Sequence, residues 1–323
     1  MPPDAREPLL RTLYVDTQGS FLARQGERLV VKRDGHPTRE LLGRRTGLVM
    51  FRGHGAISTA ALGYCLAQGI GVAMLDGHGR PLSALGGGQA RPALLRAQFR
   101  ASDDAGRRTA FARAVVRGKI ENSRLVLRRH ARERHLACAD LEQPLSRLIA
   151  QLRNASVEVA RGLEGQAARL HFRRIGDWLG NDWGFNGRNR QPARDPFNAM
   201  LSYGYAVLGE NVRVLAAAAG LDPRIGLFHA ERPGHAALAS DLMEEFRPLL
   251  VDAVCLQIAS QGRVTPGQFE IDKAGSCRMN TSARHTLIHA LEAKLSARVK
   301  RDDDDLDWRR VIGVQARRLA TWL

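Results

Sequence analysis

The sequence has few cysteines, few lysines and no long apolar run, and each scarcity excludes a class of protein. Its four cysteines, Cys65, Cys138, Cys255 and Cys277, are widely spaced and include no C-x-x-C pair. This spacing predicts neither a zinc site nor a disulfide framework, and it fits a reducing compartment. No stretch of about 18 uninterrupted apolar residues occurs, and the N-terminus lacks the apolar region of a signal peptide. We therefore expect neither a transmembrane helix nor a secretion signal.

Acidic residues are scarce relative to basic ones. Against 33 aspartates and glutamates stand 49 lysines and arginines, which gives a net charge of +16 and a pI near 10.9. Such an excess predicts a polyanionic partner, nucleic acid first and an anionic membrane surface second. Only five of the basic residues are lysine: Lys32, Lys119, Lys273, Lys294 and Lys300. A genomic preference for arginine codons explains arginine over lysine, but it does not explain the net excess.

Short strands separated by turn residues give way to helical periodicity near residue 88. Strands are expected at 13–15, 20–23, 29–32, 47–51, 70–75 and 81–85, with one helix over 58–68. Ser58 or Thr59 can cap that helix. After a linker at 86–88 the pattern predicts helices to the C-terminus, and the acidic run 302–305 is interpreted as a solvated turn. The expected fold class is α+β: a small N-terminal β-rich domain, residues 1–88, followed by a larger all-helical C-terminal domain, residues 89–323.

A long basic helix is expected over 109–135. At about 100° per residue, four of its arginines fall within about 60° of one another and form one stripe. They are Arg113, Arg117, Arg124 and Arg128. Their single sign suits a phosphate-facing surface, but a solvated face remains open. Further candidate DNA-binding residues are Arg169, Arg188 and Arg190, the last two in a loop rich in glycine, asparagine and arginine.

The stretch 226–252, GLFHAERPGHAALASDLMEEFRPLLVD, combines a histidine with several acids. A helix is expected over 235–246, which places Asp241 and Glu244 on one face. The break before it lets His229 fold back toward that face. Carboxylate oxygens with one imidazole are a ligand set for Mg²⁺ or Mn²⁺. Taken alone, the same residues also fit a solvated acidic face and a turn histidine.

Glu164 lies in RGLEGQAARLHF, within a helical run expected over 145–179. Gly162 and Gly165 flank it, and each glycine costs about 1 kcal/mol against alanine in a helix. Small residues at these positions would allow close approach of another helix or of a ligand. Without further context Glu164 fits a surface acid.

Four stretches carry a resemblance to a known family that extends over nearly the whole chain: GHGAISTAALGYCLAQGIGVAMLDGHGRPL, RGLEGQAARLHF, FNGRNRQPARDPFNAMLSYGYAVL and GLFHAERPGHAALASDLMEEFRPLLVD. Together they resemble the CRISPR-associated protein one family, the endonuclease-integrase that inserts new spacers into CRISPR arrays. The last two stretches in tandem are highly specific for that family. Two positions depart from its pattern. His171 stands where a tyrosine usually precedes the phenylalanine, and Pro192-Ala193 stands where two prolines are common.

The resemblance implies a metal site made of Glu164, His229 and Glu244, with Asp241 as a neighbouring acid of the catalytic set. The implied cofactor is Mg²⁺ or Mn²⁺, and one ion or two remain open. Clustered acids repel one another, so removing one charge is expected to leave the fold intact or even to stabilise it. The implied partners are double-stranded DNA (prespacer and CRISPR repeat), a second copy of the chain through the N-terminal domain, and the small CRISPR-associated protein two, with no membrane. The implied location is the prokaryotic cytoplasm.

The implied reaction is two successive transesterifications, in each of which a DNA 3′-hydroxyl attacks a phosphodiester at an edge of the repeat. Three alternatives remain. A structure-specific nuclease for branched DNA in repair would use water in place of the hydroxyl. A transposon-type integrase of the same family would be expected to carry an added C-terminal DNA-binding domain. A non-catalytic nucleic-acid-binding scaffold would not need all three implied metal ligands.

Overall fold

The computed structural model of the chain describes residues 11–15, 19–33, 38–76, 81–86, 91–189, 192–301 and 304–323. The chain divides into two compact units. The first unit contains Met1–Leu95, Glu210–Asp222 and Leu295–Leu323, and the second contains Arg96–Gly209 and Pro223–Lys294. The first unit thus includes C-terminal segments as well as the region expected up to residue 88. The glycines at 87–88 of the expected linker lie outside the described residues.

The first unit contains two four-stranded sheets. One has the order β1-β5-β7-β8, parallel except for β8, and its strands are β1 (Arg11–Val15), β5 (Thr46–Arg52), β7 (Gly71–Leu75) and β8 (Pro81–Leu85). The other has the order β4-β3-β2-β6, and its strands are β2 (Phe21–Gln25), β3 (Arg28–Lys32), β4 (Arg39–Leu42) and β6 (Ala56–Ile57). The sequence missed β4 and β6, which are too short for alternation to be visible.

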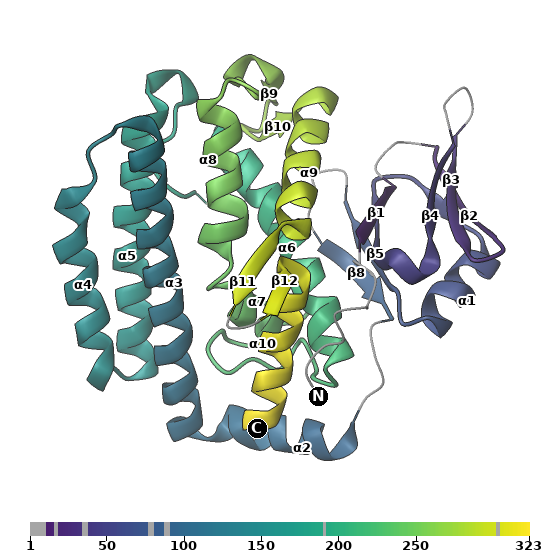
Figure 1. Cartoon of the computed structure of the whole chain (residues 1–323), viewed down its shortest axis with the longest axis horizontal. Helices are drawn as coiled ribbons and strands as arrows, with labels where there is room; N and C mark the ends of the chain where they lie inside the picture. Colours follow the sequence, from purple (N-terminus) through teal and green to yellow (C-terminus); the bar gives the residue numbers. More distant parts are fainter. Residues whose placement is uncertain are drawn as a thin grey trace. The chain divides into compact units, whose positions relative to one another are not determined.

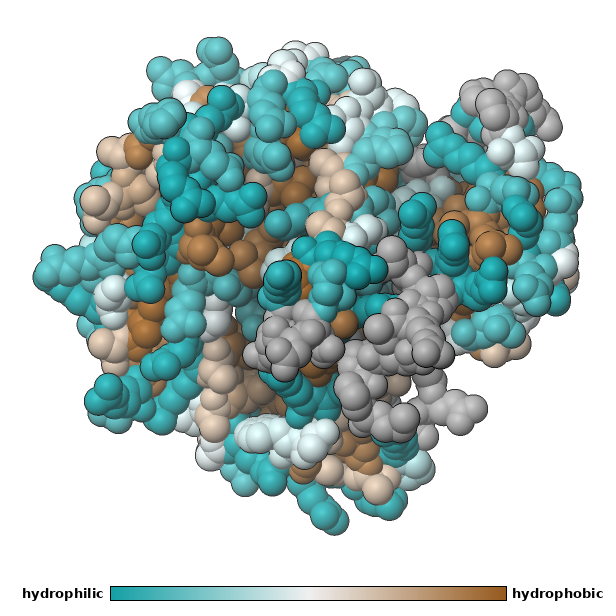
Figure 2. Space-filling view, in the orientation of Figure 1, coloured by the Kyte–Doolittle hydropathy of each residue, from teal (hydrophilic) through white to brown (hydrophobic). Residues whose placement is uncertain are grey.

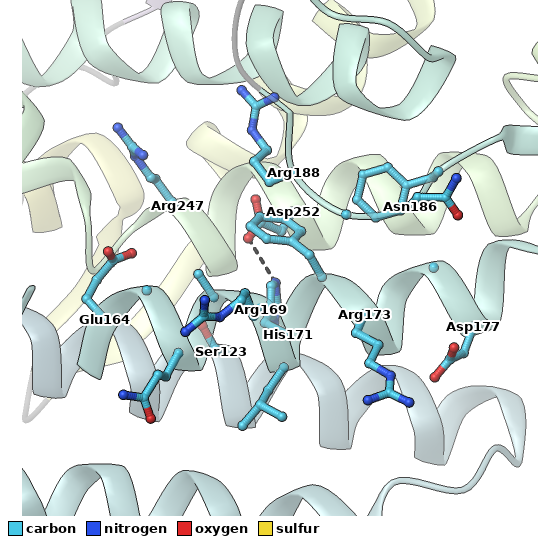
Figure 3. Close-up of a pocket in the computed structure, with 18 of the residues that line it drawn as sticks. Ser123, Glu164, Arg169, His171, Arg173, Asp177, Asn186, Arg188, Arg247 and Asp252 are labelled. Carbon is cyan, nitrogen blue, oxygen red and sulfur yellow. Dashed lines mark hydrogen bonds and ion pairs between the residues drawn. The ribbon is translucent and has the colours of Figure 1, made fainter. Parts of the chain in front are cut away.

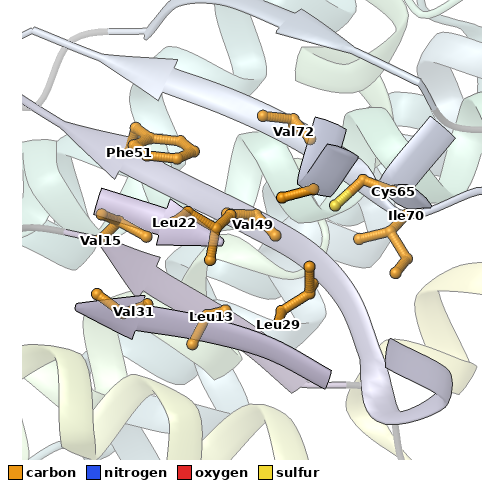
Figure 4. Packing of buried hydrophobic residues seen from close by; sticks show 11 residues of the cluster. Leu13, Val15, Leu22, Leu29, Val31, Val49, Phe51, Cys65, Ile70 and Val72 are labelled. Atoms are coloured by element: carbon orange, nitrogen blue, oxygen red, sulfur yellow. The ribbon is translucent and has the colours of Figure 1, made fainter. Parts of the chain in front are cut away.

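Alternating side chains of both sheets meet in one apolar core (Figure 4). Val15 of β1 and Leu22 of β2 pack there with Cys65 of helix α1 (Thr59–Ala67). The Ser58 hydroxyl accepts a hydrogen bond from the Ala61 amide at 3.1 Å and caps this helix, as expected from the sequence. Burying these side chains is the main source of stability for this part of the unit.

The expectation of an all-helical C-terminal region was wrong, because two short hairpins interrupt it. One pairs β9 (Phe269–Ile271) with β10 (Cys277–Met279), and the other pairs β11 (Arg298–Arg301) with β12 (Asp304–Asp307). Asp304 and Asp305 therefore belong to a strand rather than to a solvated turn, while 302–303 lie outside the described residues. The Arg298 guanidinium reaches Asp305 at 2.9 Å, so this acid of the run is paired across the hairpin with a basic residue.

Helices dominate the second unit, and α3 packs beside α4 and α5 (Figure 1). The helices of the chain after α1 are α2 (Pro92–Asp103), α3 (Ala105–Arg134), α4 (Glu142–Gln151), α5 (Val157–Leu179), α6 (Pro196–Ala218), α7 (Ala237–Met243), α8 (Ala253–Ser260), α9 (Thr281–Ser296) and α10 (Trp308–Trp322). Of these, α10, the start of α2 and the ends of α6 and α9 belong to the first unit. The run expected as helix over 145–179 breaks before Ser156, whose hydroxyl accepts from the Val159 amide and caps α5.

The molecular surface is mainly hydrophilic on the face shown in Figure 2, where smaller apolar areas lie between polar side chains. Across the part of the chain that the structure describes, no helix is long and apolar enough to cross a membrane.

Candidate active site

The loop that carries His229 is organised around one buried carboxylate, Asp241 of α7. Asp241 Oδ2 accepts hydrogen bonds from the amides of Leu227 (2.7 Å) and Phe228 (3.0 Å), and Oδ1 accepts one from the amide of His229 (2.8 Å). Oδ1 also lies 2.7 Å from the ring nitrogen Nδ1 of His229. A carboxylate can only accept, so Nδ1 donates and Nε2 is the nitrogen left for another partner.

Local sequence explains why the loop closes so tightly on α7. At Gly226 a Cβ atom would lie 2.8 Å from the Ala237 Cβ, 3.0 Å from the His229 carbonyl and 3.1 Å from Asp241 Oδ2, so only glycine fits. Arg161 of α5 donates to the Phe228 carbonyl at 2.8 Å, and its guanidinium lies over the Phe228 ring. The His229 loop is thus held from both α5 and α7.

Glu244 follows α7 directly and connects the histidine to two cations. The helix expected over 235–246 ends at Met243, and Glu244 forms its C-cap. One carboxylate oxygen, Oε1, lies 3.7 Å from His229 Nε2 and 3.2 Å from the Arg247 guanidinium. The other, Oε2, accepts from Lys119 Nζ at 2.6 Å. Burial alone would raise the pKa of Glu244, but the charges of Arg247 and Lys119 outweigh it and lower the pKa to about 2.

Lys119 of α3 joins the two glutamates that the sequence singled out. Its ammonium group forms ion pairs with Glu164 Oε1 on α5 and with Glu244 Oε2. Burial lowers the pKa of Lys119, but the charges of Glu244 and Glu164 overcome this effect, so the pKa is raised and the lysine is charged. All four expected residues therefore belong to one connected cluster. Within this cluster Asp241 differs from the other three residues, because both of its oxygens accept hydrogen bonds from the His229 loop.

The donor groups of this cluster fit a divalent cation. Two carboxylates and an imidazole with a directed Nε2 are present, and a cationic group already binds between the carboxylates. Among the described residues, however, no group of three histidine, cysteine, aspartate or glutamate side chains is placed closely enough to hold a metal ion. The three-ligand site stays a prediction.

A cavity of about 1430 Å³ opens beside the cluster and runs along α5. In Figure 3, Glu164, Arg169 and Arg173 lie along this helix, and Arg188 and Arg247 lie on the opposite side. Six basic side chains line the cavity against three acidic ones: Lys119, Arg147, Arg169, Arg173, Arg188 and Arg247 against Glu164, Asp177 and Asp252. The cavity therefore suits an anionic occupant that reaches Glu164.

A buried polar network supports one wall of the cavity. Asp252 lies 3.0 Å from His171 Nε2 and accepts a hydrogen bond from the Tyr205 hydroxyl at 2.5 Å. The guanidinium groups of Arg247 and Arg188 lie 4.8 and 5.4 Å from the centre of the Tyr205 ring. Burial and the Asp252 charge raise the pKa of Tyr205 well above its usual value, so it stays a neutral donor. His171, the departure from the family pattern, thus has a structural partner in Asp252.

The arginines proposed for DNA binding fall into two groups. In the α3 stripe, Arg113 donates to the Ala155 carbonyl at 2.7 Å, and Arg124 and Arg128 pair with Glu142 of α4 at 3.6 and 3.2 Å. Arg117 is exposed. Arg169 and Arg188 line the cavity instead, although Arg188 also donates to Asn198 and Ser202. Arg190 lies outside the described residues.

Sequence reasoning missed several residues of the site. It did not assign a role to Lys119, Arg173, Arg247 or the Tyr205–Asp252 pair. One signal was available for Lys119, which is one of only five lysines among 49 basic residues. The Tyr205–Asp252 pair carries no comparable signal, because the two residues are 47 positions apart in the chain.

Known proteins with a similar sequence or fold point in one direction. The sequence model of the family described as CRISPR associated protein Cas1 matches residues 13–293. A CRISPR-associated endonuclease Cas1 from Chlorobaculum tepidum is 35% identical over 297 residues, which are 88% of this chain and 86% of the relative. A casposase solved bound to its integration product has the same fold, with a TM-score of 0.85 and 20% identity over 97% of this chain and 90% of that one. A chain of a Cas6-RT-Cas1–Cas2 complex matches with a TM-score of 0.79 and 26% identity, over 97% of this chain and 34% of that one.

Proposed function

This chain belongs to the Cas1 family of CRISPR-associated proteins, and we propose that it is a metal-dependent DNA endonuclease and integrase that inserts new spacers into a CRISPR array. The observation that carries the proposal is the connected cluster of Glu164, Lys119, Glu244 and His229, which borders an arginine-lined cavity through Glu164 and Lys119. A strand held in the cavity by its phosphates would bring one phosphodiester to the glutamates.

Glu164, His229 and Glu244 are the residues that would hold Mg²⁺ or Mn²⁺. Such an ion, when bound, supplies positive charge that polarises the phosphoryl oxygens and stabilises the leaving oxygen. Asp241 keeps the His229 Nε2 lone pair directed toward Glu244, and Arg247 keeps the Glu244 carboxylate ionised. For Glu244 this is the ionised form that cation binding requires.

The reaction exchanges one phosphodiester for another. The oxygen of a DNA 3′-hydroxyl forms a bond to phosphorus and gives up its proton to solvent. The bond between phosphorus and the leaving 3′-oxygen breaks, and that oxygen takes up a proton from solvent to become a new 3′-hydroxyl. No energy-rich co-reactant is needed, because the number of phosphodiesters is unchanged. The protein's task is to hold the two strands in line and to neutralise charge, for which Arg169 and Arg173 in the cavity are placed.

The expected partners are a prespacer duplex, a CRISPR repeat, a second copy of this chain and a small CRISPR-associated protein two. Support for the last comes from the solved Cas1–Cas2 assembly that contains a chain similar to this one. The net charge of +16 supports a DNA partner in general.

The test is integration of a short duplex with 3′-hydroxyl ends into a supercoiled plasmid that carries a repeat, with Mn²⁺ or Mg²⁺ and the small partner present. The wild type is expected to relax the plasmid and to join the labelled duplex to it. Blocking the 3′-hydroxyl is expected to stop joining. Each of Glu164→Ala, His229→Ala and Glu244→Gln is expected to abolish joining, because each removes an implied metal ligand.

Glu231→Gln is the matched control, since Glu231 is exposed on the same loop and is expected to leave joining unchanged. Hydrolysis without any joined product, whichever metal and partner are supplied, would favour the branched-DNA nuclease over the integrase. Joining that does not depend on the repeat sequence would favour a transposon-type integrase. DNA binding without either reaction would leave only the scaffold.

A further inference from the structure

Lys119 occupies the position between the two glutamates that a metal ion would also have to contact. Its ammonium group binds one oxygen of Glu164 and one oxygen of Glu244, and its side chain is 13% exposed. Lys119 projects from α3, whereas the glutamates come from α5 and from the end of α7, so three separate elements meet at this one nitrogen.

Glu164 and Glu244 cannot bind a divalent ion while both Lys119 and Arg247 remain in their present contacts. Arg247 already contacts Glu244 Oε1 at 3.2 Å, and Lys119 contacts its other oxygen. A divalent ion bound to both glutamates would lie within a few ångströms of the ammonium, where like charges in a buried site repel strongly. One of the cations must then withdraw.

Lys119 is the cation suited to withdraw. A lysine carries a compact charge on a flexible stem, whereas the guanidinium of Arg247 is planar and is stacked on Tyr205. Lys119 also lines the cavity, so its ammonium can turn toward the space that the basic lining suits to an anion. Nearly all basic residues of this chain are arginine, but this position is a lysine. Its ammonium group is more compact than a guanidinium and is closer in size to a metal ion.

We propose that Lys119 is a tethered cation that competes with the divalent ion for Glu164 and Glu244 and turns toward the DNA phosphate when the ion binds. The inference rests on the proposed function, because it requires a metal bound by these glutamates. It adds a positioning residue that holds the two carboxylates together before metal loading and contributes charge to the substrate afterwards.

The experiment measures Mn²⁺ binding to the full chain by calorimetry, without DNA. Lys119→Met and Lys119→Gln are expected to bind Mn²⁺ at least about tenfold more tightly than the wild type, because the competing charge is gone. Lys119→Arg keeps the charge and is expected to show no such gain. Lys294→Met is the matched control: Lys294 is partly buried on α9, with Arg129 and Glu133 as its charged neighbours, so its loss should not change the affinity.

Unchanged or weaker Mn²⁺ binding by both uncharged variants would overturn the inference. Glu164→Gln in the same titration separates this failure from failure of the proposed function. If Mn²⁺ binding depends on Glu164 but not on Lys119, only the inference fails. If Mn²⁺ binding does not depend on Glu164 at all, the metal site itself is wrong and the inference falls with it. At saturating Mn²⁺, Lys119→Met is expected to join strands more slowly than the wild type, and equal rates would exclude the contact with phosphate.

Discussion

Glu244 is the residue on which the charges of the site converge. Its side chain is 4% exposed, yet it contacts Lys119, Arg247 and the ring of His229. The sequence predicts that losing one of several mutually repelling acids leaves the fold intact or stabilises it, but Glu244 is paired with these two cations, which the sequence pattern did not reveal. Removing the Glu244 charge takes one buried ion-pair partner from each of Lys119 and Arg247, and this loss is expected to lower the free energy of unfolding.

The pKa of Glu244 gives a stability prediction with a defined pH window. Its folded pKa of about 2 lies below the ordinary value of 4.5, so the carboxylate contributes stability above pH 4.5 and loses that contribution as the pH falls toward 2. In metal-free solution with a chelator present, lowering the pH through this window should reduce the free energy of unfolding of the wild type more steeply than that of Glu244→Gln. The difference in slope should reach about 1.4 kcal/mol per pH unit. Urea unfolding at a series of pH values measures it. The same acid dependence in both proteins would show that Glu244 is not held in these ion pairs.

Asp241 positions His229, so its effect on the proposed reaction is expected to be indirect. Asn at this position keeps one acceptor oxygen but replaces the other with a donor that faces backbone amides. Asp241→Asn is expected to lose about 1–3 kcal/mol of unfolding free energy and nearly all strand joining. His229→Ala should lose joining but less stability, because the amides of the His229 loop keep their bonds to Asp241. Denaturant unfolding and the plasmid assay distinguish the two. Equal stability losses would mean that the ring, rather than the backbone amides, anchors Asp241.

At the scale of elements, Gly226 and Gly162 differ in the space available for a side chain, so substituting each by alanine tests the packing of the His229 loop on α7. Gly226 has no room for a Cβ, whereas a Cβ at Gly162 in α5 would meet nothing within 4 Å. The sequence suggested that Gly162 allows another helix to approach closely, but no helix does so at that position. Gly162→Ala is expected to stabilise the protein by roughly 0.5–1 kcal/mol without changing joining. Gly226→Ala should lower both stability and joining. Thermal unfolding and the plasmid assay measure both, and a stabilised Gly226→Ala would contradict the tight packing of the His229 loop on α7.

The two groups of arginines can be separated by salt dependence. Arg169 and Arg173 on α5 are exposed along the cavity, whereas Arg124 and Arg128 on α3 pair with Glu142. Replacing Arg169 and Arg173 by glutamine should flatten the slope of log affinity for duplex DNA against log salt by about 0.9 for each phosphate that the protein no longer neutralises. Replacing Arg124 and Arg128 should change it less. Fluorescence anisotropy over a range of salt gives the slopes. The reverse order would return the phosphate-facing role to the α3 stripe.

Several secondary-structure elements could be predicted from neighbouring residues, but the contacts of the candidate site join residues that are distant in the chain. Strand β8, helix α1 and its Ser58 cap, and the start of α6 after Asp195 could all be predicted, because each depends on neighbouring residues. The ion pairs of Lys119 could not, since Glu164 and Glu244 are 45 and 125 positions away in the chain. The hairpins β9–β10 and β11–β12 were missed because their strands have only three or four residues and stand in a region whose pattern predicts helices. Glu164, His229 and Glu244 were found through family resemblance, since periodicity alone left them as surface acids and a turn histidine.

At the scale of the whole molecule, the first compact unit contains segments from both ends of the chain. Buried Arg309 of α10 donates to Thr12 of β1, 297 positions away, and to Asn211 of α6. Truncation after residue 88 would therefore remove partners of β1, which is why the compact unit is larger than the N-terminal domain expected from composition. Experiments on dimerisation should use the full chain.

The predicted homodimer has a physical basis in the exposed edge of the first sheet. Strand β8 ends the order β1-β5-β7-β8, and Leu82 and Leu85 on it are 67% and 43% exposed. An apolar edge strand presents unpaired backbone groups together with hydrophobic side chains, so a second copy can satisfy both. Leu82→Lys is expected to shift the full chain from dimer to monomer at micromolar concentration, as measured by sedimentation equilibrium. Ile271→Lys is the matched control, because Ile271 is 65% exposed on β9 of the second unit and should leave the dimer intact. A wild type that is monomeric throughout would refute the dimer, and a dimer that resists Leu82→Lys would move the interface away from β8.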